Sequence, residues 1–168
     1  EENNMEKKHS HGGHEAGGCP GAKMMDLREN APADSGPAGK APSMLRQWPV
    51  QLHLISPMAP YFQKADLVVA ADCTAFAYGN FHAEFLKGRA AVIACPKLDD
   101  GQEVYVEKIQ ALIEDAKINT LTVLTMEVPC CGGLLAMVQQ AAAAAKRKVP
   151  VKSIVVGIGG TIKSEEWA

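Results

Sequence analysis

Residues 121–146 read LTVLTMEVPCCGGLLAMVQQAAAAAK, and they combine three local patterns in a row. Residues 121–128 form an apolar run rich in β-branched side chains, which is typical of a buried strand. Residues 134–146 are rich in alanine and other helix formers, so they predict a helix. A proline, two adjacent cysteines and two glycines lie between them and predict a tight turn. The stretch therefore predicts a strand–turn–helix unit that carries Cys130 and Cys131 at its turn.

The residues that follow the adjacent cysteines favour a ligand or redox role for the two thiols. Gly132 and Gly133 allow the backbone to come close to whatever the thiols hold. The N-terminus of the following helix is expected to favour the charged thiolate form of the cysteines. We therefore interpret Cys130 and Cys131 as ligands or redox groups, with two small buried apolar side chains as the alternative.

Apolar runs and helical patterns continue to alternate through residues 45–168. Further strands are predicted at residues 50–54, 67–71, 90–94 and 154–158, and further helices at residues 80–87 and 103–117. The first of these strands alternates apolar and polar side chains and predicts an edge strand, whereas the others predict strands covered on both faces. Strands that alternate with helices pair in parallel through right-handed crossovers. The sequence therefore predicts an α/β fold with a five-stranded, mainly parallel, Rossmann-like sheet and flanking helices.

Residues 1–44 differ in composition from the rest of the chain. They hold three histidines among glycines, and residues 30–43 contain three prolines but no large apolar side chain. We expect a flexible tail and linker, because such a composition buries too little apolar surface to offset its ordering entropy. The histidines are interpreted as part of a solvated tail, with binding of a soft metal ion as the alternative. Cys19, in the segment CPGAKMM, is a further candidate metal ligand.

Charge and composition bear on the class of function. The formal net charge of −2 gives no reason to expect nucleic acid or an acidic membrane surface as a partner. No apolar run approaches the ~20 residues of a membrane span, and the chain is expected in the cytoplasm. Five cysteines in a reducing compartment indicate ligands or reactive thiols rather than a disulfide framework. The chain begins at Glu1, which we interpret as residues added before Met5 or as the start of a piece of a longer polypeptide.

Cysteines recur at equivalent places in the predicted sheet. Cys73, Cys95 and the adjacent Cys130 and Cys131 each follow one of three predicted strands. The carboxyl ends of parallel strands lie at one edge of the sheet, where open α/β folds bind ligands. His82, early in the helix after Cys73, is expected to face the same crevice, with a structural loop contact as the alternative. The sequence therefore predicts one metal site formed by these four thiols and this imidazole.

The donor types limit which metal the site can take. Thiolates and an imidazole suit zinc or an iron–sulfur cluster, not magnesium or calcium. The chain has no Cys-x-x-Cys, which excludes a ferredoxin-type cluster or a zinc ribbon built from closely spaced ligands. Any site must therefore be assembled from distant loops. Asp72, Asp99 and Asp100 are expected at the same edge, as loop and capping residues or as groups that support the ligands.

Several stretches resemble a family of iron–sulfur, ferredoxin-like proteins of anaerobic bacteria and archaea. The stretches are HEAGGCPGAKMM (14–25), LRQWPVQLHL (45–54), AADCTAFAYGNFHAEF (70–85), ACPKLDD (94–100) and MEVPCCGG (126–133). In that family a pair of 4Fe-4S ferredoxin motifs precedes a C-terminal α/β domain. The resemblance implies an iron–sulfur cluster as cofactor and a ferredoxin domain or ferredoxin-type electron carrier as partner. It also implies that the shared pattern includes Cys73, His82, Cys95, Cys130 and Cys131, with Cys19 in addition.

This chain departs from that family by lacking the ferredoxin cysteines, which a missing upstream domain would explain. A second similarity is to the cysteine-rich domain of heterodisulfide-reductase-type subunits, in which a cysteine is followed by Cys-Cys-Gly. Cys95 and the later Cys-Cys-Gly match this first part of the pattern, but the Cys-x-x-Cys that completes the pattern is absent.

Three functions remain open from the sequence. The first is an iron–sulfur domain with a redox or electron-transfer role, as part of an oxidoreductase. The second is a zinc-binding α/β domain, either structural or hydrolytic, in which Cys73, His82 and Cys95 leave a position for water, loosely like a β-type carbonic anhydrase. The third is a protein-interaction module with buried thiols, and a homo-oligomer is compatible with each.

Overall fold

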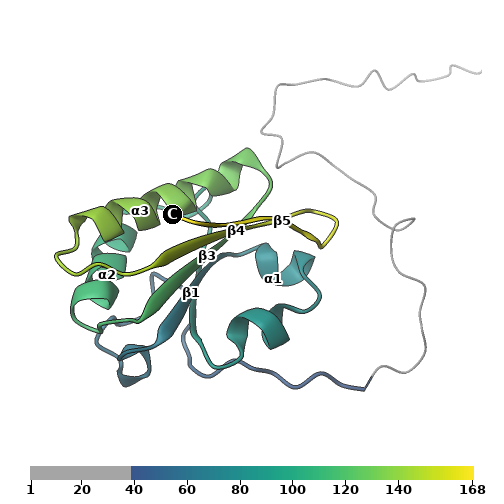
Figure 1. Ribbon diagram of the computed structural model, residues 1–168, viewed down its shortest axis with the longest axis horizontal. Helices are drawn as coiled ribbons and strands as arrows, with labels where there is room; N and C mark the ends of the chain where they lie inside the picture. Colours follow the sequence, from purple (N-terminus) through teal and green to yellow (C-terminus); the bar gives the residue numbers. More distant parts are fainter. Residues whose placement is uncertain (1–38) are drawn as a thin grey trace, which may run out of the picture.

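A five-stranded sheet organises the computed structural model, which describes residues 39–168 (Figure 1). Its strands are β1 (Asp66–Ala71), β2 (Ala90–Ala94), β3 (Thr120–Met126), β4 (Val151–Val156) and β5 (Ile162–Trp167). The strand order is β2-β1-β3-β4-β5, with β1 to β4 parallel and β5 antiparallel to β4. The prediction of a mainly parallel, Rossmann-like sheet is confirmed. The predicted flexible tail falls almost wholly on residues 1–38, outside the described residues.

The middle of the sheet is buried on both faces because its strands are continuously apolar. In β1, Leu67 and Val69 pack into the larger core cluster, whereas Val68 and Ala70 pack into a second cluster on the opposite face. Successive side chains of a strand point to opposite faces, so a run without polar residues can only lie between two layers.

Two helices cover one face of the sheet (Figure 1). They are α2 (Glu103–Glu114) and α3 (Gly132–Ala144), both close to their predicted positions. The opposite face carries the short α1 (Thr74–Ala77) and a π-helical turn (His82–Leu86), where a helix was predicted at residues 80–87. The chain leaves that turn through Gly88, whose φ of 76° favours glycine. Within residues 39–168, no helix has the length and apolar character that crossing a membrane requires.

The predicted strand at residues 50–54 is wrong. Only Gln51 forms a bridge, parallel to Ile93 at the free edge of β2, and the chain then turns. The turn is stable because Lys108 of α2 donates hydrogen bonds to three of its carbonyls, those of Leu52, His53 and Ile55. The alternating pattern therefore reflects a turn in which Leu52 is buried and Leu54 is exposed.

The other edge strand, β5, was not predicted. Its sequence, IKSEEW, is mostly polar and exposed, so it lacks the apolar run by which the inner strands are recognised. Charged side chains are common on edge strands, where they discourage pairing with a second chain. A tight turn joins β4 to β5 through a hydrogen bond from the Gly157 N–H to the Thr161 carbonyl, at 2.8 Å.

Candidate functional site

The cysteines of the described region lie where the sequence predicts them. Cys73 follows β1, Cys95 follows β2, and Cys130 with Cys131 follows β3. These three strands are direct neighbours and parallel, so the cysteines share the carboxyl edge of the sheet. Cys73 is exposed, Cys95 and Cys130 are half-buried, and Cys131 is buried. The thiols at this edge therefore differ in their exposure to solvent.

Cys130 and Cys131 lie in a 3-10 turn, η5 (Pro129–Cys131), that leads directly into α3. The Cys131 N–H donates to the Val128 carbonyl at 3.1 Å, which fixes the turn. The side chains of Cys130 and Cys131 are hydrogen-bonded to each other, and Cys73 lies near enough to act on Cys131 electrostatically. The thiols of Cys130 and Cys131 are therefore paired after β3, and the thiol after β1 lies within electrostatic range of Cys131.

Burial raises the pKa of the Cys131 thiol to about 11. The nearby Cys130 and Cys73 raise it further, whereas a hydrogen bond from the backbone of Met126 acts in the opposite direction. The net shift of the Cys131 pKa is therefore opposite to the thiolate form that the helix N-terminus was expected to favour, and its largest cause is loss of contact with water.

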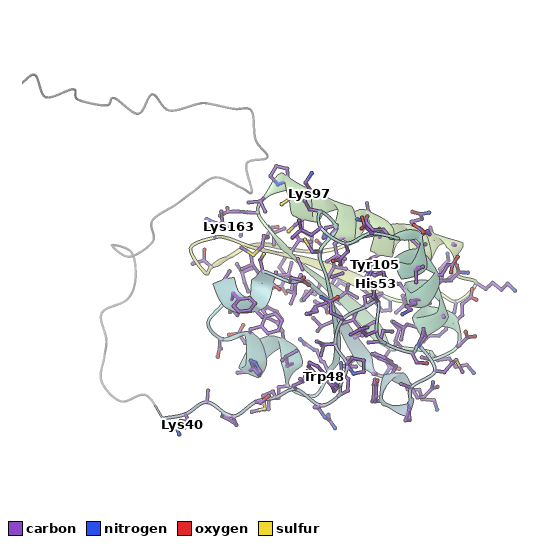
Figure 2. The ribbon with its side chains drawn as sticks, turned by 180° about the vertical axis from the view of Figure 1, so that it is seen from behind. Lys40, Trp48, His53, Lys97, Tyr105 and Lys163 are labelled. Carbon is purple, nitrogen blue, oxygen red and sulfur yellow. The ribbon has the colours of Figure 1, made fainter. Side chains whose placement is uncertain are left out.

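The loop that carries Cys95 is fixed by a hydrogen-bond network. One carboxylate oxygen of Asp99 accepts from the Cys95 N–H at 2.8 Å and from the Tyr105 hydroxyl at 2.6 Å. Tyr105 is fully buried in α2, and its ring lies against His53 with the centroids 4.5 Å apart (Figure 2). The network joins the Cys95 loop to the core, so the position of this cysteine is set by α2 as well as by β2.

The same loop packs closely against the start of α3. A Cβ atom at Gly133 would lie 3.2 Å from the Cβ of Pro96, which is tighter than most carbon contacts. Glycine at this position therefore lets the loop after β2 approach the turn that holds Cys130 and Cys131.

A carboxylate pair lies beside Cys95. The pKa of Asp72 is raised, mainly by burial and then by the charge of Asp99, while a hydrogen bond with Gln51 opposes the rise. One oxygen of Asp72 is buried and has no hydrogen-bond partner among residues 39–168. Burial, together with the Asp99 carboxylate, also raises the pKa of Tyr105. Sequence reasoning placed the aspartates at this edge but missed Tyr105, because an aromatic residue in an amphipathic helix is usually only a core residue.

His82 contacts the segment of residues 41–44. Its Nδ1 atom accepts a hydrogen bond from the Met44 N–H at 3.1 Å, and the exposed ring lies by a surface pocket lined partly by residues 41–44. Cys19 lies outside the described residues. In the described part of the chain, no group of three or more His, Cys, Asp or Glu side chains is arranged to hold a metal ion. The ligand roles of Cys19, Cys73, His82, Cys95, Cys130 and Cys131 therefore stay predictions.

Two large apolar side chains are exposed next to the thiols. Phe76 is 93% exposed and Leu98 is 80% exposed, and each stands three positions after a cysteine, Cys73 and Cys95 respectively. The edge therefore combines soft sulfur donors, a half-buried carboxylate and apolar surface open to solvent. Such a set can bind a soft metal or meet a partner protein.

The comparisons with known proteins concern this same region. A family model described as a Rossmann-like domain matches residues 59–167, which include the cysteines at the three strand ends. An uncharacterized protein of Archaeoglobus fulgidus is 31% identical over 119 residues, which cover 71% of this chain and 83% of that protein. No solved structure matches the chain significantly.

Proposed function

The chain belongs to the Rossmann-like domain family, and on that premise we propose that it is an iron–sulfur or related soft-metal binding domain with a redox or electron-transfer role. The observation that carries the proposal is the position of the cysteines, which follow three neighbouring parallel strands. Packing alone would accept alanine, valine or serine there. Ligands of open α/β folds bind at this edge, and sulfur is the preferred donor of soft metals.

The donor set fits an iron–sulfur cluster chemically. Cys73, Cys130 and Cys131 would hold it from the ends of β1 and β3, with Cys95 added from the end of β2. A bound cluster would supply one-electron redox chemistry. The Asp99 carboxylate orients the loop of Cys95, and the buried thiol of Cys131 must give up its proton before it can bind. Metal binding is therefore expected to release protons and to weaken as the pH falls.

The proposal includes a partner. Phe76 and Leu98 offer apolar surface beside the thiols, as expected where a second protein covers the site. We assign that position to a ferredoxin domain or a ferredoxin-type electron carrier, which would exchange electrons with the cluster. The proposal places the domain in the cytoplasm, where reducing conditions keep thiols available for metal.

A zinc site is the second candidate, and one observation favours it. The buried oxygen of Asp72 lacks a partner among the described residues, and a carboxylate oxygen is an ordinary zinc ligand. Asp72 adjoins Cys73 and lies near Asp99 in the loop after Cys95, so a mixed sulfur and oxygen set is within the same edge.

Metal loading of the full chain under anaerobic conditions tests the proposal. Purified protein is offered iron with sulfide, or zinc, and the metal and acid-labile sulfide bound per chain are measured together with the visible absorption spectrum. We expect iron and sulfide to bind, and Cys73→Ser and Cys130→Ser to lose most of both, while Ser164→Ala on β5 keeps them. Binding of zinc alone would select the second candidate. Failure to bind either metal, or full loading of both cysteine variants, would contradict a metal site.

A further inference from the structure

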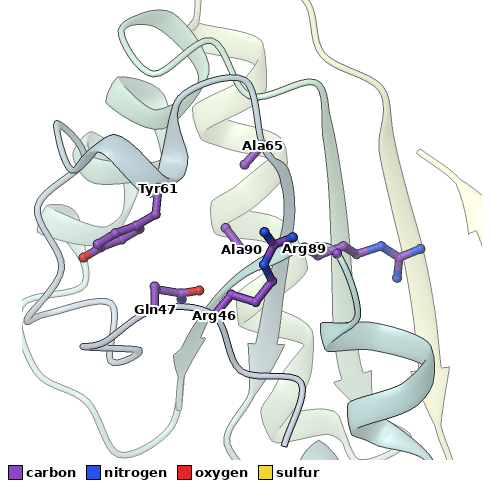
Figure 3. A pocket seen from close by; sticks show the side chains of 7 residues that line it. Arg46, Gln47, Tyr61, Ala65, Arg89 and Ala90 are labelled. Carbon is purple, nitrogen blue, oxygen red and sulfur yellow. The ribbon is translucent and has the colours of Figure 1, made fainter.

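A pocket opens at the edge of the sheet opposite to the cysteines. Ala65, just before β1, and Ala90, the first residue of β2, lie at its base (Figure 3). Its volume is about 250 Å³. That is slightly below the range of about 300–1,000 Å³ that is usual for small-molecule sites, so any ligand is small.

The charged side chains that line the pocket are positive. Two arginines line it, and no acidic side chain of the described residues 39–168 does. The side chain of Arg46 reaches toward Ala90 (Figure 3), and no carboxylate among residues 39–168 forms an ion pair with it. Arg89 instead donates to the Glu84 carbonyl at 3.0 Å, and its side chain points away from the pocket (Figure 3). Within the described part of the chain, the guanidinium of Arg46 therefore has no carboxylate partner and is open to a ligand.

The walls of the pocket are held in place and are largely apolar. Gln47 is only 8% exposed, and its amide donates a hydrogen bond to the Ala91 carbonyl of β2. The Tyr61 hydroxyl makes a long contact, 3.5 Å, with the Trp48 carbonyl, so the polar tip of this residue is directed to the backbone. The ring of Tyr61 and the methyl groups of the alanines are left to line the space. A flat apolar group is the shape that such walls accept.

We propose that this pocket binds a small carboxylate with a flat apolar body, such as an aromatic acid. The Arg46 guanidinium receives the carboxylate, because its planar N–H donors match the two carboxylate oxygens. The ring of Tyr61 and the side chains of Ala65 and Ala90 receive the hydrocarbon part. This site is separate from the thiol edge and does not depend on any metal.

Titration with benzoate tests the proposal on the full chain. Amide signals of a ¹⁵N-labelled sample are followed, and we expect saturable shifts centred on Ala65 and Ala90 at millimolar benzoate. Benzamide has the same shape without the charge and is expected to bind about fivefold more weakly, the factor that corresponds to an ion pair at a surface. Inorganic phosphate, which has charge without an apolar body, is expected to bind more weakly than benzoate.

Two matched variants test the role of Arg46. Arg46→Gln is expected to weaken benzoate about fivefold, whereas Lys87→Gln, which removes a positive charge from an exposed side chain that does not line the pocket, leaves the affinity unchanged. The amide spectrum itself reports whether each variant is folded. The proposal is overturned if tens of millimolar benzoate leaves Ala65 and Ala90 unshifted, or if benzamide or phosphate binds as well as benzoate. Equal losses in the two variants would overturn it as well.

Discussion

Alkaline pH is expected to destabilise the protein through the buried thiol of Cys131. A cysteine titrates near 9.0 when it is unperturbed, whereas the pKa of Cys131 in the folded chain is about 11. Between these values the unfolded state has lost the proton and the folded state still holds it, so unfolding becomes more favourable as the pH rises. The stabilising effect is complete below pH 9 and fades toward pH 11. Because one pKa unit corresponds to about 1.4 kcal/mol, roughly 2 kcal/mol is lost by pH 11.

Urea unfolding of metal-free, reduced protein at a series of pH values measures this loss. Cys131→Ala removes the thiol and also costs stability at every pH, so the quantity compared is the change in unfolding free energy from about pH 8 to about pH 11. Wild type is expected to lose roughly 2 kcal/mol more than Cys131→Ala over that range. Ser164→Ala on β5 changes no group that acts on the pKa of Cys131 or of Tyr105, so it is expected to behave like wild type. Equal pH dependence of wild type and Cys131→Ala would refute the reasoning.

Three further predictions concern the exposure of the cysteines, the turn at Gly160 and the hydroxyl of Tyr105. Among the four cysteines of residues 39–168, alkylation of the reduced, metal-free protein is expected to modify exposed Cys73 first and buried Cys131 last in peptide mass spectra, and the reverse order would contradict their burial. Gly160→Ala is expected to lower the unfolding free energy by at least about 2 kcal/mol, because φ is 79° and a Cβ atom would lie 2.8 Å from a carbonyl of α1. Gly159→Ala, with open space around its Cβ, is the control, and an equal cost in both variants would disprove that reading. Tyr105→Phe is expected to cost about 1 kcal/mol in urea unfolding through loss of its hydroxyl hydrogen bond, and an unchanged midpoint would argue against that bond.

Strands β1 and β2 could be predicted because each is a continuous apolar run in the sequence. The apolar run predicted at residues 90–94 coincides with β2, and that at residues 67–71 matches β1 to within one residue. The segments that lie beside β2 and β4 at the two sides of the sheet could not be predicted in the same way. Residues 50–54 have the alternating pattern of a strand but form a turn whose carbonyls accept hydrogen bonds from Lys108. Strand β5 forms although its side chains are mostly polar. At an edge, pairing depends on what lies beside the segment rather than on its own apolar content.

The cysteine positions followed from topology alone, since parallel strands bring their carboxyl ends to one edge. The state of the thiols did not follow, because it depends on burial by residues distant in sequence. Cys131 keeps its proton for that reason, despite its place at the start of a helix. Two other contacts also depend on the tertiary fold: Tyr105 bonds to the loop of Cys95, and His82 bonds to Met44. No spacing in the sequence predicts either contact.

X-ray absorption at the edge of the bound metal tests the central claim most directly, because it counts the sulfur atoms around the metal. After anaerobic loading of the full chain, the account predicts a first shell made mainly of sulfur at about 2.3 Å, and a smaller sulfur count or lost metal in Cys73→Ser and Cys130→Ser. A first shell of oxygen and nitrogen without sulfur would contradict the assignment of the thiols at the ends of β1, β2 and β3 as the metal site.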